Sequence, residues 1–226
     1  MATGALVIAG PSAVGKTTVG NILLSEDSRF CLSRSVTTRA PRGDGFDAEY
    51  IYLSREEFVS LRERGGLFEW TEYSGDLYGT AVSEIERINA EGKIPLLIID
   101  LAGVRSVGEG RGNIDSCILY IYDDLNVMES RLYQRYLSSS PDAKKLKSFV
   151  DRKEKNIKDY LDLPDICKYL FAFIHNSGEP SATAELLLKA FSEHESGMPR
   201  KGEQIADTAR SLAASAAEKL EVKPQE

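Results

Sequence analysis

The feature that most constrains this chain is a glycine-rich turn at residues 10–17. The apolar run ALVIA, residues 5–9, precedes GPSAVGKT, which has the spacing G-x-x-x-x-G-K-[ST] of a phosphate-binding loop. Glycines let backbone N–H groups turn inward around an anion. The helical pattern after the loop adds a helix N-terminus, whose dipole also favours negative charge. The sequence therefore predicts a nucleoside triphosphate site between a buried strand and a helix.

Side chains of this loop have separate predicted roles. Lys16 places a positive charge on the outer phosphates, and the Thr17 hydroxyl can be a ligand of Mg²⁺. Asp100 ends the apolar run 94–99 and is a candidate second Mg²⁺ ligand, directly or through water; the alternative is an aspartate that caps a helix. The residues predicted to bind ATP here are Gly10, Pro11, Ser12, Ala13, Val14, Gly15, Lys16, Thr17 and Thr18.

Apolar runs alternate with helical patterns along most of the chain, which indicates an α/β fold with a parallel central sheet. Expected strands cover 5–9, 30–36, 94–99, 117–122 and 169–174, and expected helices cover 16–26, 81–91, 125–137, 147–161 and 182–194. Short strands, turns and a capping box that begins at Ser54 distinguish residues 37–91, which we expect to form an inserted mixed α/β lobe. The alanine-rich segment 203–220 is expected to be a solvated or loosely docked helix, with a partner-binding helix as the alternative.

Composition narrows the function classes. The net charge of −7 argues against a broad nucleic-acid-binding face. Three cysteines without paired or metal-like spacing are typical of a reduced, cytoplasmic protein. No apolar stretch is long enough to cross a membrane, and we see no secretory signal. We therefore expect small-molecule substrates, and leave open a monomer or a homodimer.

A second group of residues could bind another phosphate and a base. The segment SVTTRAPR, residues 35–42, holds two arginines three positions apart, which can form bidentate hydrogen bonds to a phosphate; two solvated surface arginines are the alternative. Glu69-Trp70 and Tyr78-Gly79-Thr80 follow. A carboxylate can accept from the adjacent N–H donors of guanine, a pair that adenine lacks.

With these segments in this order, the chain resembles guanylate kinases over about residues 4–195. The resemblance implies a P-loop three-layer fold with a helical lid. It implies that Ser35, Glu69 and Thr80 read guanine, that Arg39, Arg42, Tyr50 and Tyr78 hold the GMP phosphate beside Gly79, and that Asn176 contacts the adenine of ATP. Arg131, Arg135 and Arg152 match the lid arginines and join Lys16 as candidate catalytic residues; pairing of the first two with nearby acids such as Glu129 is the alternative.

The resemblance also implies a division of the chain and a reaction. The P-loop core would comprise 1–36, 93–124 and 162–195, with a GMP-binding lobe at 37–92, a lid at 125–161 and a tail at 196–226. We expect Mg²⁺-dependent transfer of the γ-phosphoryl group of ATP to GMP, with deoxy-GMP left open as an acceptor. The alternatives are a kinase for another nucleoside monophosphate, or a non-catalytic guanylate-kinase-like module that binds peptides. Ile98 stands where the family usually has an acid, and Ala13 where glycine is common.

Overall fold

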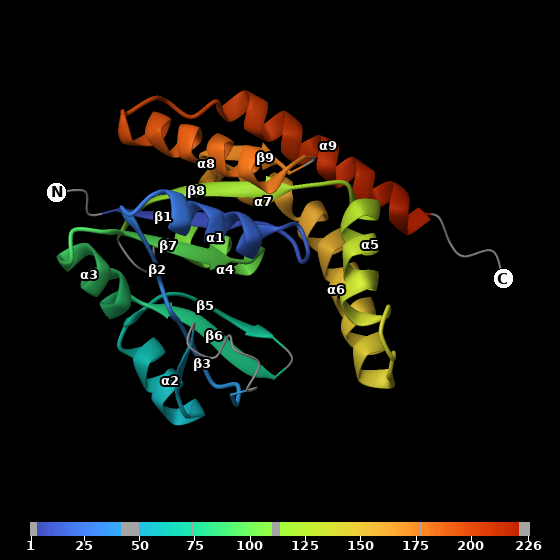
Figure 1. Ribbon diagram of the computed structural model, residues 1–226, viewed down its shortest axis with the longest axis horizontal. Coiled ribbons are helices and arrows are strands. Elements are labelled where there is room, and N and C mark those ends of the chain that lie inside the picture. Colours follow the sequence, from blue (N-terminus) through green and yellow to red (C-terminus); the bar gives the residue numbers. More distant parts are fainter. Residues whose placement is uncertain (1–3, 42–49, 74, 110–113, 177, 222–226) are drawn as a thin grey trace. The chain divides into compact units, whose positions relative to one another are not determined.

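The computed structural model describes residues 4–41, 50–73, 75–109, 114–176 and 178–221 (Figure 1). Its elements in chain order are β1 (Gly4–Ala9), α1 (Lys16–Glu26), β2 (Phe30–Leu32), β3 (Ser35–Thr37), β4 (Tyr50–Tyr52), α2 (Arg55–Glu63), β5 (Leu67–Tyr73), β6 (Asp76–Ala81), α3 (Val82–Ala90), β7 (Ile94–Ile99), α4 (Leu101–Gly108), β8 (Asp115–Tyr122), α5 (Leu125–Tyr136), α6 (Ala143–Leu161), α7 (Leu163–Ile166), η2 (Cys167–Tyr169), β9 (Ala172–His175), α8 (Pro180–Glu195) and α9 (Gly202–Glu221).

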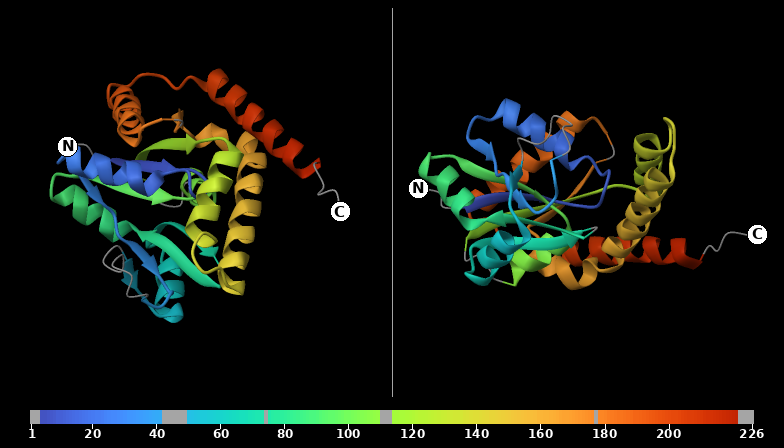
Figure 2. Two further views of the ribbon diagram at one scale, coloured as in Figure 1. Left: turned by 45° about the vertical axis from the view of Figure 1, so that its right-hand side comes forward. Right: turned by 90° about the horizontal axis from the view of Figure 1, so that it is seen from below.

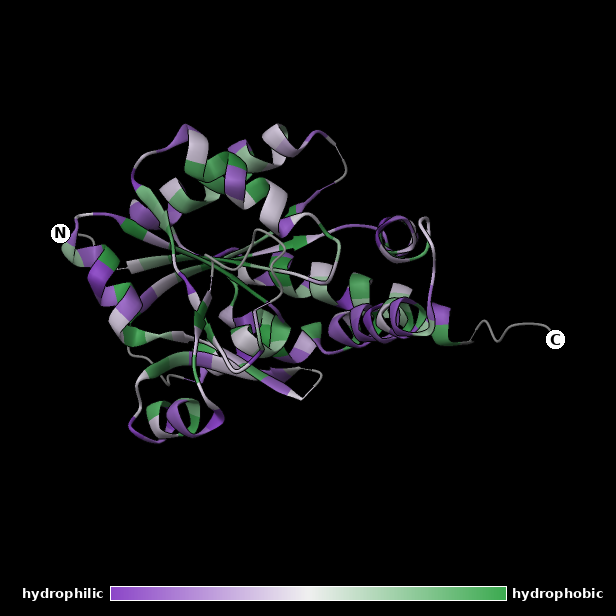
Figure 3. Ribbon diagram, turned by 60° about the horizontal axis from the view of Figure 1, so that its bottom comes forward, coloured by the Kyte–Doolittle hydropathy of each residue, from purple (hydrophilic) through white to green (hydrophobic). Residues whose placement is uncertain are grey.

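The long apolar runs form a five-stranded sheet with strand order β2-β7-β1-β8-β9. β2 pairs with β7 and β8 pairs with β9, both in parallel. The side chains of β1 from Ala5 to Ala9 are at most 2% exposed, as expected of a strand covered on both faces. Figure 3 shows the corresponding strands largely in the hydrophobic colour. The predicted α/β class is thus confirmed.

A second, four-stranded sheet has the order β4-β3-β6-β5 and is mixed. β3 runs parallel to β4 and antiparallel to β6, and β5 is antiparallel to β6. Behind it lies a separate small core that includes Val36, Phe58 and Leu77. The capping box predicted at Ser54 is present at the start of α2, where Ser54 and Glu57 each bond the other's backbone N–H.

Chain contacts divide the molecule into two compact units. One contains the described residues up to Ile8 and from Gly20 to Ile118, and the other contains Ala9–Val19 together with the chain from Leu119 onward. The phosphate loop and the helices α5 and α6 belong to the second unit, and the four-stranded sheet to the first.

Several predicted boundaries were wrong. The expected strand 30–36 is two strands in different sheets, because the Ser33 N–H makes a last bond to the Leu96 carbonyl (2.9 Å) before the chain leaves β7. The helix α6 starts earlier than expected, at a cap where the Asp142 carboxylate accepts from the Lys145 N–H. The helix α8 begins at Pro180, earlier than the expected 182, and proline is well suited to the first turn of a helix. The expected strand at 169–174 begins only at Ala172.

The C-terminal helix α9 is packed rather than merely solvated. It packs against α6 and α7, and both views of Figure 2 show it beside α6. Ile205, Ala209 and Ala216 on its inner face are at most 4% exposed, and the small alanines allow close approach of the helices. Among the described helices, none has both the length and the apolar character needed to cross a bilayer.

Candidate active site

The phosphate loop has the backbone conformation that its glycines predict. Gly10 and Gly15 have φ angles of +152° and +102°. A Cβ on Gly10 would lie 2.4 Å from the Ile121 carbonyl oxygen, and one on Gly15 would lie 2.5 Å from Nδ2 of Asn176. Between them Ala13 has a φ of +62°, a left-handed conformation that costs a residue with a Cβ about 1–2 kcal/mol.

Polar side chains of the loop are placed where the motif requires them. Nζ of Lys16 donates to the carbonyl oxygens of Gly10 (2.7 Å) and Pro11 (2.8 Å), so the ammonium group lies over the loop. Thr17 and Thr18 are exposed in the first turn of α1. The loop therefore offers a positive charge and a hydroxyl beside a helix N-terminus, the donor set that phosphates and Mg²⁺ take.

Two of the three predicted lid arginines reach this loop. Nη1 of Arg131 donates to the Ala13 carbonyl oxygen (3.3 Å) and pairs with the buried Asp123 carboxylate (2.9 Å). Nη1 of Arg152 donates to Oγ of Ser12 (3.2 Å). Arg135 is exposed on α5. Paired with Asp123, Arg131 does not form the alternative ion pair with an acid of its own helix. Glu129 of α5 instead pairs with Lys153 of α6 (2.6 Å).

Two buried asparagines hold the loop backbone. Nδ2 of Asn176 donates to the Val14 carbonyl oxygen (2.7 Å), and its Oδ1 accepts from the Thr183 hydroxyl (2.6 Å). Asn176 was predicted from the family as an adenine contact, and that role stays a prediction. Asn156 of α6 bonds both the N–H and the carbonyl of Ser12. Our sequence reasoning missed Asn156; the only available signal was its position one helical turn after Arg152.

The three predicted guanine-reading residues lie on one rung of the four-stranded sheet. Ser35 of β3 is the register partner of Thr80 of β6, and Thr80 is the partner of Glu69 of β5. The Thr80 hydroxyl donates to Oε1 of Glu69 (2.8 Å). Gly79 serves packing, since a Cβ there would lie 2.6 Å from the Glu69 carbonyl oxygen. The structure thus brings together residues separated by up to 45 positions in the sequence.

Burial alters the chemistry of Glu69. Its side chain is among the buried polar groups of the chain at 5% exposure, and burial raises its pKa to about 7. The nearby negative charge of Asp100 raises the pKa further, and the Thr80 hydrogen bond opposes this. A carboxyl group with such a pKa accepts hydrogen bonds fully only above neutral pH.

Three residues predicted to hold the GMP phosphate, Arg39, Tyr50 and Tyr78, also lie close together in this lobe. The Arg39 guanidinium is buried at 8% exposure and lies 5.0 Å from the ring centroid of Tyr50. The Tyr50 and Tyr78 rings meet edge-on with centroids 6.5 Å apart. Arg42, the second predicted arginine, lies outside the described residues.

Asp100 occupies the position that the alternative interpretation predicted. Its carboxylate caps α4 by accepting from the Gly103 N–H (3.0 Å). Capping uses one oxygen, so a second role toward Mg²⁺ stays a prediction. The helix α4 was not expected from the sequence, because it is short and contains a glycine.

A sequence model of the guanylate kinase family matches residues 2–164, most of the chain. The chain belongs to the guanylate kinase family. A guanylate kinase of Synechocystis sp. is 37% identical over 131 residues, which cover 58% of this chain and 68% of that protein. The guanylate kinases of Prochlorococcus marinus and Rubrobacter xylanophilus are both 42% identical, over 46% and 47% of this chain. The match spans only 57% and 56% of the length of these two relatives.

A guanylate kinase of known structure supports the fold assignment. The crystal structure of guanylate kinase from Anaplasma phagocytophilum matches with a TM-score of 0.58 at 24% sequence identity. The match covers 86% of this chain and 87% of the other. It extends well beyond residue 164, where the match to the guanylate kinase sequence model ends.

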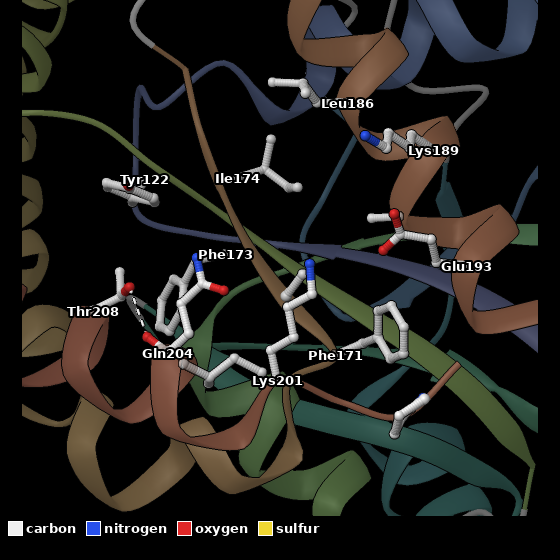
Figure 4. Close-up of a pocket in the computed structure, with 14 residues that line it drawn as sticks. Tyr122, Phe171, Phe173, Ile174, Leu186, Lys189, Glu193, Lys201, Gln204 and Thr208 are labelled. Carbon is white, nitrogen blue, oxygen red and sulfur yellow. Dashed lines mark hydrogen bonds between the residues drawn. The ribbon is translucent and has the colours of Figure 1, made fainter. Parts of the chain in front are cut away.

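One cavity lies apart from every predicted site residue. It has a volume of about 240 Å³ and is lined by side chains of β9, α8 and α9 (Figure 4). Phe173 and Ile174 contribute apolar surface, and Lys189 and Lys201 are among the lining residues. Most of its lining follows residue 164, beyond the part that matches the guanylate kinase family model.

Proposed function

We propose that this chain catalyses transfer of the γ-phosphoryl group of ATP to GMP, giving ADP and GDP. The observation that carries the proposal is the rung formed by Ser35, Thr80 and Glu69, in a chain that has a complete phosphate loop. The ionised Glu69 carboxylate accepts from the two adjacent N–H donors of guanine. AMP and UMP do not present that pair, so the buried carboxylate would be left desolvated beside them.

On the donor side, backbone N–H groups of the loop bind the phosphates of ATP and Lys16 neutralises their charge. Arg131, Arg135 and Arg152 stabilise the charge that spreads over the transferring group. Mg²⁺, with Thr17 and Asp100 as the oxygen donors it prefers, would neutralise charge on the β- and γ-phosphates. Phosphoryl transfer requires positioning and charge neutralisation more than a nucleophile–base pair.

On the acceptor side, Arg39, Arg42, Tyr50 and Tyr78 hold the GMP phosphate. Stacking on Tyr50 presets the Arg39 guanidinium, which lowers the entropy lost when it forms a bidentate contact. Deoxy-GMP is a further candidate acceptor, because the contacts named above go to the base and the phosphate. We place the reaction in the cytoplasm, where the free thiols of Cys31, Cys117 and Cys167 stay reduced.

The test is ADP release from ATP in a coupled assay with GMP, deoxy-GMP, AMP and UMP as acceptors. GMP should give the highest kcat/KM, and Lys16→Ala should lower it at least about a hundredfold. Preference for AMP or UMP would support another monophosphate kinase, and no turnover with any acceptor would support a peptide-binding module. A bisubstrate analogue that joins adenosine and guanosine through five phosphates should bind more tightly than ATP or GMP alone. Transfer requires the γ-phosphate of ATP and the phosphate of GMP to come together, so one linked molecule should occupy both sites at once.

A further inference from the structure

Asn156 makes a two-point contact with one residue of the phosphate loop, bonding the peptide units on both sides of Ser12. The Ser12 N–H donates to its Oδ1 (2.7 Å), and its Nδ2 donates to the Ser12 carbonyl oxygen (3.0 Å). The side chain is 2% exposed, so neither bond competes with bulk water. Arg152, one turn earlier on α6, bonds the hydroxyl of the same serine (3.2 Å).

These bonds act on the most strained point of the loop. The Ser12 carbonyl belongs to the peptide plane that precedes Ala13, and the orientation of that plane sets the φ angle of Ala13. That angle is +62°, which an alanine adopts only at a cost of about 1–2 kcal/mol. Two hydrogen bonds of typical net strength, about 0.5–1.5 kcal/mol each, are enough to offset it.

Three successive carbonyls of the loop have a donor from outside the loop. Asn156 donates to Ser12, Arg131 to Ala13 and Asn176 to Val14. Carbonyl groups held outward in this way favour N–H groups that converge on the opposite side, which is the arrangement of an anion-binding nest. Asn156 bonds Ser12, the residue directly before the strained Ala13. It is neither part of the phosphate-loop motif nor one of the predicted lid arginines.

We propose that Asn156 is a positioning residue that holds the phosphate loop in its nucleotide-binding conformation and links it to α6. It acts through the backbone of Ser12 and does not touch the substrate. α6 itself does not depend on this contact, because the Lys153–Glu129 ion pair (2.6 Å) and the packing of α9 also hold it. The proposal extends the proposed phosphoryl transfer, but its main readout is nucleotide binding.

Isothermal titration calorimetry with Mg·ADP tests the proposal on the full chain. Asn156→Ala removes both bonds and should raise the Kd of Mg·ADP about tenfold. Lys158→Gln is the matched control, because Lys158 is exposed on the same helix and is not part of the site. The KM of GMP should change less than about twofold in either variant, since Asn156 contacts only the donor loop.

A second variant separates positioning from packing by means of pH. Asn156→Asp keeps the acceptor for the Ser12 N–H but places a carboxylate oxygen against the Ser12 carbonyl; protonation restores the missing donor. Arg152, through Ser12, and Lys153, Lys219 and Glu129, which line a cavity with Asn156, are the charged groups that face it. Relative to the wild type at the same pH, the ionised carboxylate should raise the Kd more than about tenfold at pH 8, and lowering the pH should bring the Kd back toward the wild-type value as the carboxyl protonates.

Each possible result of these titrations either supports or overturns the proposed role of Asn156. Weakened ADP binding in Asn156→Ala and, at pH 8, in Asn156→Asp supports the proposal. A wild-type Kd in Asn156→Ala, an equal loss in Lys158→Gln, or a wild-type Kd in Asn156→Asp at pH 8 overturns it. If the unaltered chain binds Mg·ADP but does not phosphorylate GMP, the proposed function fails while this test still stands.

Discussion

If Glu69 reads guanine as proposed, its elevated pKa makes guanine binding depend on pH in a calculable way. Burial raises that pKa to about 7, and only the ionised carboxylate accepts both N–H donors of guanine. The ionised fraction is then about one in eleven at pH 6 and about ten in eleven at pH 8. Because apparent affinity scales with the competent fraction, the Kd of GMP should be about tenfold higher at pH 6 than at pH 8.

Calorimetric titration of GMP at several pH values measures this directly. Glu69→Gln has no carboxyl to titrate, so it should bind GMP weakly and lose the steep pH dependence, whereas Glu72→Gln, an exposed change on the same strand, should keep it. The phosphate of GMP also titrates near pH 6, and its contribution remains in Glu69→Gln and can be subtracted. An identical pH dependence in Glu69→Gln and the wild type would refute the role of Glu69.

The same pKa affects folding with a defined sign. The pKa of Glu69 rises from 4.5 to about 7 in the folded chain. Its contribution to the free energy of unfolding is therefore fully present below pH 4.5 and is lost as the pH rises through 7. Denaturant titrations of the nucleotide-free chain should show this loss, and Glu69→Gln should remove it.

Three further changes probe the loop and the first unit. Gly15→Ala puts a Cβ 2.5 Å from a buried amide nitrogen at φ +102° and should abolish measurable ADP binding, whereas Gly92→Ala, at φ +73° with open space around it, should leave binding unchanged. Ala13→Gly relieves a φ of +62° and should stabilise the chain by about 0.5–1 kcal/mol in urea titrations, while the exposed Ala102→Gly in α4 should destabilise it by a similar amount. Glu84, whose pKa is lowered to about 2 by hydrogen bonds from two arginines, contributes stability above pH 4.5 that is lost as the pH falls toward 2; Glu84→Gln should cost about 1–2 kcal/mol at pH 7, a value reduced for screening of the partly exposed arginines, and nothing near pH 2.

Elements with strong local signals were predictable from the sequence. The run at 94–99 is apolar throughout and became β7 with unchanged bounds, and the capping box at Ser54 marks the start of α2. The prediction of a single strand over 30–36 was wrong, because two short strands that follow each other closely give the same sequence pattern as one longer strand. What separates them is tertiary: a last bond from Ser33 to Leu96, and the pairing of Ser35 with Thr80 in another sheet.

The candidate site shows a similar division. Residues within contiguous motifs, such as Lys16 and Glu69, could be proposed from spacing and resemblance. The capping of α4 by Asp100 could be listed only as an alternative, because α4 gives a weak helix signal. The pKa of Glu69 could not be anticipated at all, since it results from burial and from the charge of Asp100, 31 positions away.

The phosphate loop shows why a motif does not by itself define a binding site. Ala13 occupies a position that the motif leaves unspecified, and it adopts a left-handed conformation that alanine disfavours. The interactions that hold it in this conformation must therefore come from elsewhere in the chain. They come from donors to three successive carbonyls, and one of these donors, Asn156, follows Ser12 by 144 positions. α6 carries both Asn156 and Arg152, so on the proposed roles of these residues a shift of α6 also shifts the loop, and nucleotide binding to the loop in turn favours one position of α6. The proposal therefore links nucleotide affinity to the placement of Arg152, a predicted lid arginine, through Ser12.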